Sequence, residues 1–150
     1  MADKAANSDV RFTIYGNPRA QKRHRFARRG SYIAAIDDSK DDKANFLSQI
    51  MQHRPEQPWD KSLAIELVFV LPHPKSHFRT GKHAGELRPD IPYMCSKKPD
   101  IDNYIKLVLD ALNGVFFLDD AQVVKIEAQK RYDHLPERPR TEVVLRYMTI

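Results

Sequence analysis

Five aspartates lie in one short stretch of an otherwise basic chain. The stretch covers residues 96–124, SKKPDIDNYIKLVLDALNGVFFLDDAQVV, and its aspartates are Asp100, Asp102, Asp110, Asp119 and Asp120. Clustered carboxylates repel one another unless a cation joins them. Hard divalent cations such as Mg²⁺ prefer oxygen ligands and often lie between carboxylates and a substrate phosphate. The stretch is therefore a candidate for metal-assisted chemistry on a phosphate compound.

The remainder of the chain suits a polyanionic partner. Its 150 residues carry a formal net charge of +5, with 25 Lys and Arg against 20 Asp and Glu. Such a balance favours an anionic partner, most commonly nucleic acid, although charge alone fits a merely soluble basic protein equally well. A hydrophobic content of 41% is enough for one core in a domain of ordinary size.

Neither membrane insertion nor secretion is expected. The chain has no run of about 18 apolar residues, and its first residues, MADKAANSDV, lack the apolar centre of a signal peptide. One cysteine, Cys95, excludes an internal disulfide and fits a reducing compartment. We therefore expect a cytoplasmic protein.

Apolar patterns predict the elements that must position the acidic stretch. Alternating or continuous apolar runs predict strands at 10–15, 63–71, 123–131 and 141–148. Helical spacing of apolar residues predicts helices at 37–53 and 103–112. We expect one α/β domain over 1–150, with a mixed sheet of about four strands, two packed helices and the order β-α-β-α-β-β. Residues 1–9 are expected to be disordered, and 72–94 to form a long, mobile basic loop.

The second helix carries two patterns. Its expected apolar stripe consists of Ile101, Ile105, Val108, Leu109 and Leu112. Asp102, Lys106 and Asp110 are spaced i, i+4, i+8 along another side, which on an arbitrary helix indicates only a solvated face.

The acidic residues at element boundaries have similarly simple alternatives. Asp100 or Asp102 fits a helix N-cap, and Asp119 with Asp120 fits a polar turn before a strand. Taken together, the three boundary positions favour convergence on one point, because a helix that folds back on the sheet can bring such ends together.

The same residues carry a resemblance to a known family. KPDIDNYIKLVLDALNG followed by FFLDDAQVV resembles the signature of RusA-type Holliday junction resolvases over Lys98–Val124, and GNPRAQKRHRF resembles, more loosely, their basic loop after the first strand. The resemblance implies a RusA-like fold and a crossover junction endodeoxyribonuclease of bacteria or their phages. It also implies a homodimer that uses Mg²⁺, or Mn²⁺ in its place, to resolve four-way junctions by paired phosphodiester cuts in DNA recombination and repair. No small-molecule cofactor is expected.

The resemblance also implies roles for single residues. The essential acids of the family fall on Asp100, Asp102 and Asp120, a supporting acid on Asp119, and an important lysine on Lys106. We expect the four aspartates to hold the metal over the scissile phosphate, and water to attack phosphorus in line. Lys106 is expected to stabilise the developing negative charge or to steer the phosphate.

Basic residues around the stretch are the candidates for DNA binding. Most belong to one predicted loop over 19–32, and two precede Asp100: Arg19, Lys22, Arg23, Arg25, Arg28, Arg29, Lys97 and Lys98. Phe26 and Tyr32 of that loop could wedge against bases, but anchoring to the core is the favoured interpretation. A weaker basic set lies within 72–94: Lys75, Arg79, Lys82 and Arg88.

One alternative motif is rejected, and two alternative functions remain open. Pro99-Asp100 resembles the start of a PD-(D/E)xK nuclease motif, but Glu127 and Lys130 are separated by two residues instead of one. A non-catalytic branched-DNA binding protein is the main alternative, and an interaction protein with surface aspartates is the other. For a dimer interface, the candidates are an edge strand of the sheet and the apolar segment 115–117.

Overall fold

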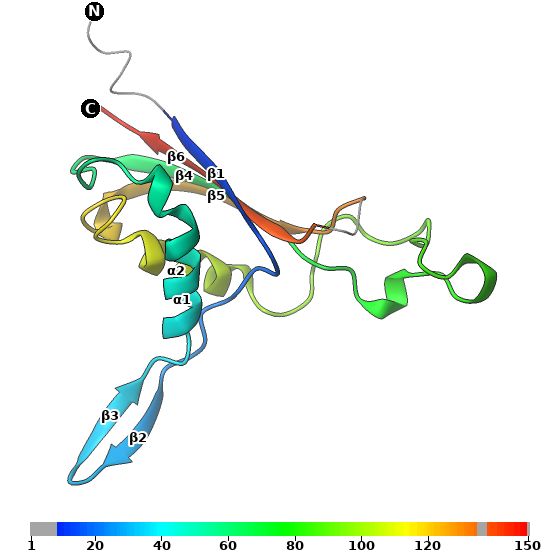
Figure 1. Ribbon diagram of the computed structural model, residues 1–150, viewed down its shortest axis with the longest axis horizontal. Coiled ribbons are helices and arrows are strands. Elements are labelled where there is room, and N and C mark those ends of the chain that lie inside the picture. The colour runs from blue at the N-terminus through cyan, green and yellow to red at the C-terminus, as the bar shows by residue number, and fades with distance from the viewer. Residues whose placement is uncertain (1–8, 135–137, 150) are drawn as a thin grey trace, which may run out of the picture.

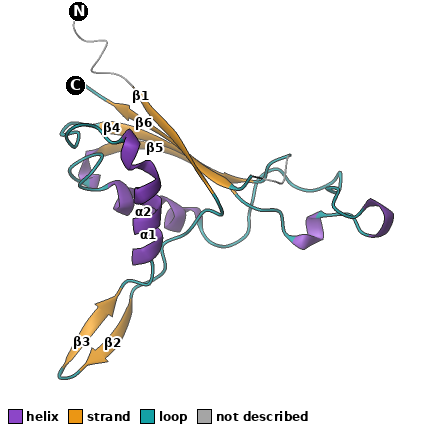
Figure 2. Ribbon diagram, in the orientation of Figure 1, coloured by secondary structure: helices purple, strands orange, loops and turns teal. Residues whose placement is uncertain are grey.

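The structure is a computed structural model that describes residues 9–134 and 138–149 (Figure 1). Its centre is a four-stranded sheet in the order β1-β6-β4-β5, and both α-helices lie on one face of this sheet. A two-stranded hairpin and a long arm extend from this body in different directions (Figure 2). The predicted α/β fold, with a mixed four-stranded sheet and two packed helices, is confirmed.

The sheet consists of β1 (Asp9–Tyr15), β4 (Leu63–Val70), β5 (Val123–Arg131) and β6 (Arg140–Tyr147). β6 pairs antiparallel with both β1 and β4, whereas β5 pairs parallel with β4. β4 is buried along most of its length, as its continuous apolar run predicts. Consequently β1 and β5 are the two edges of the sheet. Of the expected disordered lead, Asp9 already belongs to β1, and 1–8 lie outside the described residues.

The helices are α1 (Lys40–Ile50), which a 3-10 turn at Met51–His53 follows, and α2 (Ile101–Leu112). The predicted helix at 37–53 began too early, because the Asp37 carboxylate accepts the backbone N–H of Ser39 at 2.9 Å and forms a turn before α1. α2 begins two residues before the predicted helix at 103–112.

The buried side of α2 is displaced from the expected apolar stripe. Its fully buried residues are Tyr104, Leu107, Val108, Ala111 and Leu112. Three members of the expected stripe, Ile101, Ile105 and Leu109, are only half-buried. The stripe was misplaced because Tyr104 packs as a core residue, stacked on Phe69 of β4 with ring centroids 5.0 Å apart.

The apolar segment after α2 is part of the core. Phe116 and Phe117 are both 0% exposed and pack with Leu63, Ile65 and Leu145 of the sheet. Phe116 also contacts Phe12 of β1, with ring centroids 5.6 Å apart. The segment 115–117 was therefore the wrong candidate for a dimer interface.

The basic loop predicted at 19–32 contains a hairpin that the sequence analysis missed. β2 (Arg25–Arg29) and β3 (Tyr32–Ile36) pair antiparallel and project from the body (Figure 2). Gly30, with φ of +62°, occupies the first of the two turn residues between the strands. A positive φ at this position is what a type II′ hairpin turn requires, and glycine adopts it without strain.

Residues 72–94 form an arm with local structure. It contains two 3-10 turns, Lys75–His77 and Gly81–His83. The outgoing and returning segments of the arm are joined by backbone hydrogen bonds from Arg79 N to Glu86 O at 2.7 Å and from Arg88 N to His77 O at 2.8 Å. The expected mobility of this segment stays a prediction. Among the described residues, no helix combines the length and the apolar character that a membrane span requires.

Candidate active site

Asp100 and Asp102 lie at the N-terminal end of α2. Asp100 occupies the N-cap position, but its carboxylate makes no capping hydrogen bond. It instead accepts a hydrogen bond from Lys98 Nζ at 2.8 Å, and this bond, together with the charge of Lys130, lowers the pKa of Asp100. Because both carboxylates are exposed, their oxygens are available to a ligand.

The segment that leads into Asp100 is fixed by the sheet. Lys130, near the end of β5, donates hydrogen bonds from Nζ to the carbonyl oxygens of Lys97 at 2.7 Å and Pro99 at 2.8 Å. Cys95 N also donates to Lys130 O at 3.0 Å. Lys130 thus links the position of Asp100 to the edge of the sheet.

A basic hollow lies beside these carboxylates, one turn further along α2. It has a volume of about 280 Å³ and is lined by Gln21, Lys22, Arg23, His24, Asn103 and Lys106. The loop 19–24 is seated on α2 by a hydrogen bond from Gln21 N to Asn103 O at 2.8 Å. Lys106 is exposed, and within the described part of the chain no hydrogen bond or ion pair engages its amino group. The hollow therefore offers an anion at least one unpaired cation.

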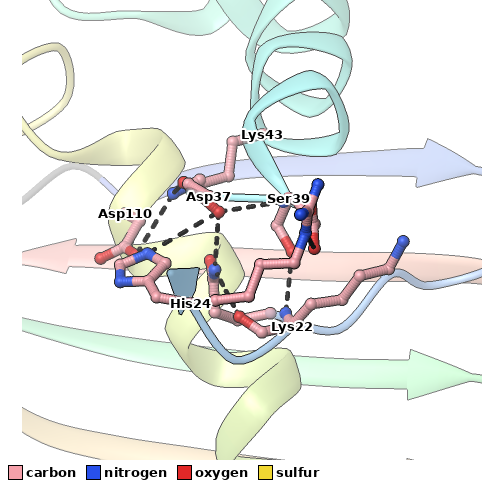
Figure 3. Close-up of polar contacts among 9 residues, drawn as sticks. Lys22, His24, Asp37, Ser39, Lys43 and Asp110 are labelled. Carbon is pink, nitrogen blue, oxygen red and sulfur yellow. Dashed lines mark hydrogen bonds and ion pairs between the residues drawn. The ribbon is translucent and has the colours of Figure 1, made fainter. Parts of the chain in front are cut away.

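A polar network centred on Asp37 holds this basic loop against both helices (Figure 3). The Asp37 carboxylate accepts hydrogen bonds from Lys43 of α1 and from Gln21 Nε2 at 3.0 Å. The hydrogen bond from Lys43 is the largest of the effects that hold the pKa of Asp37 well below its usual range. Lys43 also lies 3.7 Å from the carboxylate of Asp110 on α2. The network thus joins the base of the hairpin, α1 and α2.

The second acidic group lies at the other end of α2. Asp120 begins a 3-10 turn (Asp120–Gln122) that leads into β5, and it accepts a hydrogen bond from Asn113 Nδ2 at 3.0 Å. Burial, opposed by this hydrogen bond, raises the pKa of Asp120, and the charges of Asp110 and Asp119 raise it further. A cation placed here would relieve the repulsion among three neighbouring carboxylates.

Gln122 fixes the turn that carries Asp119 and Asp120. Its Oε1 accepts the N–H groups of Leu118 and Asp119, both at 2.8 Å. Its Nε2 donates to the carbonyl oxygens of Trp59 at 2.7 Å and Lys61 at 2.8 Å. All four bonding positions of one amide are therefore used to hold this turn against the loop before β4.

The structure brings some of the predicted site residues together and separates others. Asp100, Asp102, Lys98 and Lys106 share the N-terminal end of α2, whereas Asp120 contacts Asn113 at its C-terminal end. At 1.5 Å per residue, the helix places these ends about 16 Å apart. No group of three acidic, histidine or cysteine side chains in the described ranges is arranged to hold a metal ion. The expected convergence is thus not found within one chain.

The structure divides the candidate DNA-binding residues between the Asp100 end of α2 and the projecting hairpin. Arg19, Lys22 and Arg23 lie in the loop against α2, Lys97 and Lys98 precede Asp100, and Arg25, Arg28 and Arg29 belong to β2. Arg25 is engaged by Asp38, with Nε 2.8 Å from Oδ2.

The two aromatic residues of the hairpin are on its surface. Phe26 is 73% exposed and Tyr32 is 64% exposed. The interpretation that they anchor the loop to the core was therefore wrong: the hairpin projects beyond the core, so its side chains cannot reach it.

Sequence reasoning missed the residues that position the carboxylates. Lys130 was considered only as part of a PD-(D/E)xK motif, and Asn113 directly follows the predicted helix at 103–112 without an assigned role. Gln122 stands in the DDAQVV motif, but no role followed from its position. Its partner Trp59 is 63 residues away in the chain, so only the fold reveals the contact.

Comparison with known proteins identifies the family to which the chain belongs. The family model for Endodeoxyribonuclease RusA matches residues 15–146. A relative from Bacillus subtilis (strain 168), described as "Uncharacterized protein YqaN", is 36% identical over 147 residues, covering 91% of this chain and 95% of the relative. The match to the family model spans every strand and helix of the sheet domain except most of β1 and the last residue of β6. The chain therefore belongs to the RusA endodeoxyribonuclease family.

Proposed function

We propose that the protein is a homodimer that resolves Holliday junctions by paired, Mg²⁺-dependent hydrolysis of DNA strands. It acts in DNA recombination and repair in the cytoplasm of a bacterial cell, and its gene could be bacterial or belong to a phage or prophage. The observation that carries this proposal is the exposed pair Asp100 and Asp102 beside a basic hollow, in a chain that matches the RusA family over 15–146.

The N-terminal end of α2 fits a hard divalent cation. Its two exposed carboxylates supply oxygen donors, and Mg²⁺ in phosphate-processing sites is commonly held by one or two carboxylates plus substrate phosphate and water. Asp100 and Asp102 would hold the ion. When bound, the ion supplies Lewis acidity to the phosphate and lowers the pKa of a coordinated water. Mn²⁺ suits the same oxygen donors.

The lysines around this pair act on the phosphate. Lys98 now donates to Asp100 at 2.8 Å and is 84% exposed, so it can turn to a phosphate once Asp100 binds a cation. Lys106 lines the hollow with an unengaged amino group. It stabilises the negative charge that develops on the phosphoryl oxygens, which a preorganised cation does at no cost of rearrangement.

Asp120 enters such a site from a second protomer. One α2 separates Asp120 from Asp102 by about 16 Å, which is too far for both to act on one phosphate. In a two-fold symmetric dimer, Asp102 of one chain and Asp120 of the other can meet twice, once at each of two equivalent sites. Two such sites match the two opposed cuts that resolve a junction. Asp119 assists by keeping the potential at Asp120 negative.

The basic residues bind the junction backbone. Arg19, Lys22 and Arg23 border the hollow, and the hairpin carries Arg28 and Arg29 away from the body. A two-stranded ribbon is narrow enough to enter the major groove. Binding therefore rests on cation–phosphate contacts and weakens as salt rises.

A synthetic four-way junction tests the activity. Wild type should make paired, symmetric nicks with Mg²⁺, none with EDTA, and none in a linear duplex. Asp102→Asn should bind the junction at least as tightly as wild type but not cut it. The matched control is Asp60→Asn, which changes an exposed aspartate and should cut normally. Tight binding by the wild type without cutting would favour the non-catalytic branched-DNA binder instead, and normal cutting by Asp102→Asn would refute the site.

Mixed dimers test the sharing of residues between protomers. Asp102→Asn and Asp120→Asn chains should each be inactive alone. If each site takes Asp102 from one chain and Asp120 from the other, a mixed dimer has one doubly altered site and one intact site. It should then nick one strand at a time. If both residues act from the same chain, each site of the mixed dimer carries one alteration, and no nicks should appear.

A further inference from the structure

The outer edge of β5 is only partly covered. At its C-terminal end, the segment 93–95 pairs with it through hydrogen bonds from Cys95 N to Lys130 O at 3.0 Å and from Tyr132 N to Tyr93 O at 2.9 Å. Along 124–129, no backbone hydrogen bond from another described segment reaches this edge. An open strand edge is a template for pairing with another chain.

The side chains on this open edge are partly apolar. Val124 is 59% exposed and Ile126 is 41% exposed. Ile105 and Leu109 of α2 are half-buried nearby, because α2 packs over β5 on one flank and contacts α1 through Asp110 on the other. Together they form an apolar patch at an edge strand whose residues 123–131 include no proline to block pairing.

We propose that this edge pairs antiparallel with the same edge of a second copy, about a two-fold axis at Ile126. The backbone directions fit such pairing. Lys130 O points outward, to Cys95, and N–H and C=O groups alternate between the two sides of a strand. Those of Ala128 and Ile126 therefore point outward too. Ile126 and Ile126 of the partner subunit then exchange both hydrogen bonds, as a directly opposed pair does.

The charge pattern selects this register. With the axis at Ile126, Lys125 lies opposite Glu127 of the partner subunit, and Glu127 opposite the partner's Lys125. Both side chains are about two-thirds exposed, 65% and 64%, so neither is committed to the core. Moving the axis to Lys125 would oppose two lysines, and moving it to Glu127 would oppose two glutamates. Directly opposed like charges destabilise an antiparallel pair, whereas opposite charges stabilise it.

The other sheet edge lacks these features. On β1, the exposed positions alternate as Asp9, Arg11, Thr13 and Tyr15, while Phe12 and Ile14 face the core. Arg11 is engaged by Asp9, with Nη2 3.4 Å from Oδ2. The one exposed large hydrophobic side chain of β1 is Tyr15 at its end, which has the Arg138 guanidinium 5.0 Å from its ring centroid, so β1 offers no apolar pair like Val124 and Ile126.

The pairing also orders the two acidic groups, a consequence that rests on the proposed function. α2 runs antiparallel to β5, because Lys130 near the end of β5 contacts Pro99, whereas Asp120 precedes its start. A two-fold axis perpendicular to the sheet at Ile126 places the two α2 helices on the same face, in opposite directions. The Asp120 end of one helix then lies beside the Asp100 end of the other.

Charge reversal tests the register in solution without DNA or metal. Lys125→Glu and Glu127→Lys each place two like-charged pairs across the axis, and each should weaken dimerisation by about tenfold or more. The double variant Lys125→Glu/Glu127→Lys restores opposite charges and should recover the wild-type dimer. Sedimentation over a range of protein concentrations measures the dissociation constants. A monomeric wild type, or single variants that dimerise as well as wild type, would overturn the proposed interface.

A cysteine pair tests the position of the axis. In a Cys95→Ala background, Ile126→Cys should form a covalent dimer under mild oxidation, since directly opposed residues lie about 5.5 Å apart, within disulfide reach. Arg11→Cys at the other sheet edge is the control: it should still dimerise through β5 but form no covalent dimer in the absence of reductant. A covalent dimer from Arg11→Cys alone would overturn the proposal. A dimer that forms through β5 but never cuts DNA would contradict the nuclease function and leave the interface intact.

Discussion

Gln122 is the residue whose loss should most directly displace Asp119 and Asp120 without touching either carboxylate. Gln122→Leu removes four hydrogen bonds of 2.7–2.8 Å that hold the turn against the loop before β4. A net contribution of 0.5–1.5 kcal/mol per bond, taken near its lower end because most of these groups are reached by water, gives a loss of about 2–3 kcal/mol.

This loss should be visible in two assays. In a domain of this size, about 2–3 kcal/mol corresponds to a fall in Tm of roughly 5–10 °C, measurable by circular dichroism. In single-turnover cleavage of a four-way junction, the rate constant should fall while the junction Kd is unchanged, because the basic residues that bind DNA lie at the other end of α2.

Two further variants of glutamine sharpen the result. Gln122→Glu keeps the two accepted bonds but places a carboxylate against the carbonyl oxygens of Trp59 and Lys61, and it should be as destabilised as Gln122→Leu at neutral pH. Gln129→Leu, on the same β5 strand, is the control, since no hydrogen bond of its side chain is found in the described structure. Wild-type Tm and cleavage in Gln122→Leu would refute the assignment of Gln122 as the residue that positions the turn.

Four further outcomes are expected. Because burial and neighbouring charges raise the pKa of Asp120, its ionisation opposes folding. Asp120→Asn should therefore abolish cleavage but raise the free energy of unfolding at pH 7 by about 0.5–1 kcal/mol in thermal unfolding, and this gain should disappear below about pH 4. A lower Tm than wild type at pH 7 would contradict this. Lys106→Met should leave Tm within about 0.5 kcal/mol of wild type but slow cleavage about 10²-fold, so equal cleavage rates would remove Lys106 from the site. The depressed pKa of Asp37 stabilises the fold above its unfolded pKa of about 3.9, and this stability is lost as pH falls. Asp37→Asn should lower the free energy of unfolding by about 1–2 kcal/mol at pH 7 and make stability less dependent on pH in the acid range. Wild-type dependence of stability on acid pH in Asp37→Asn would contradict this. Arg28→Ala/Arg29→Ala should lower the salt dependence of junction binding by about two counterions, which titrations across KCl concentrations would detect, and an unaltered slope would mean that the hairpin does not touch phosphate.

The strands of the sheet were predictable because each has a recognisable apolar pattern within its own residues. β4 is a continuous apolar run, which is typical of a central, buried strand. β1 and β6 alternate between apolar and polar residues, which is typical of strands with one buried face. The hairpin was not predicted because the β2 sequence RFARR shows no alternation of apolar and polar residues and none of its side chains is buried in the core. The signal that could have revealed it is Gly30-Ser31, a two-residue turn between segments of equal length.

Only part of the placement of the carboxylates could be predicted from the sequence. Asp102 and Asp120 are close in sequence, but a rigid helix and a turn lie between them and set them about 16 Å apart. This separation could have been calculated from the length of the predicted helix. The contacts that fix each end could not be foreseen, because Lys130 and Gln122 bind backbone far from them in the chain.

The central position of β6 has a consequence for how the chain acquires its structure during synthesis. β6 is the last strand in the chain, yet it lies between β1 and β4, the first and the second strands of the sheet to be made. Until β6 emerges from the ribosome, β1 has no hydrogen-bonding neighbour and β4 exposes one edge. Pairings between such distant segments form slowly. The nascent chain therefore stays without a complete sheet, and without a working nuclease site, until translation has passed β6.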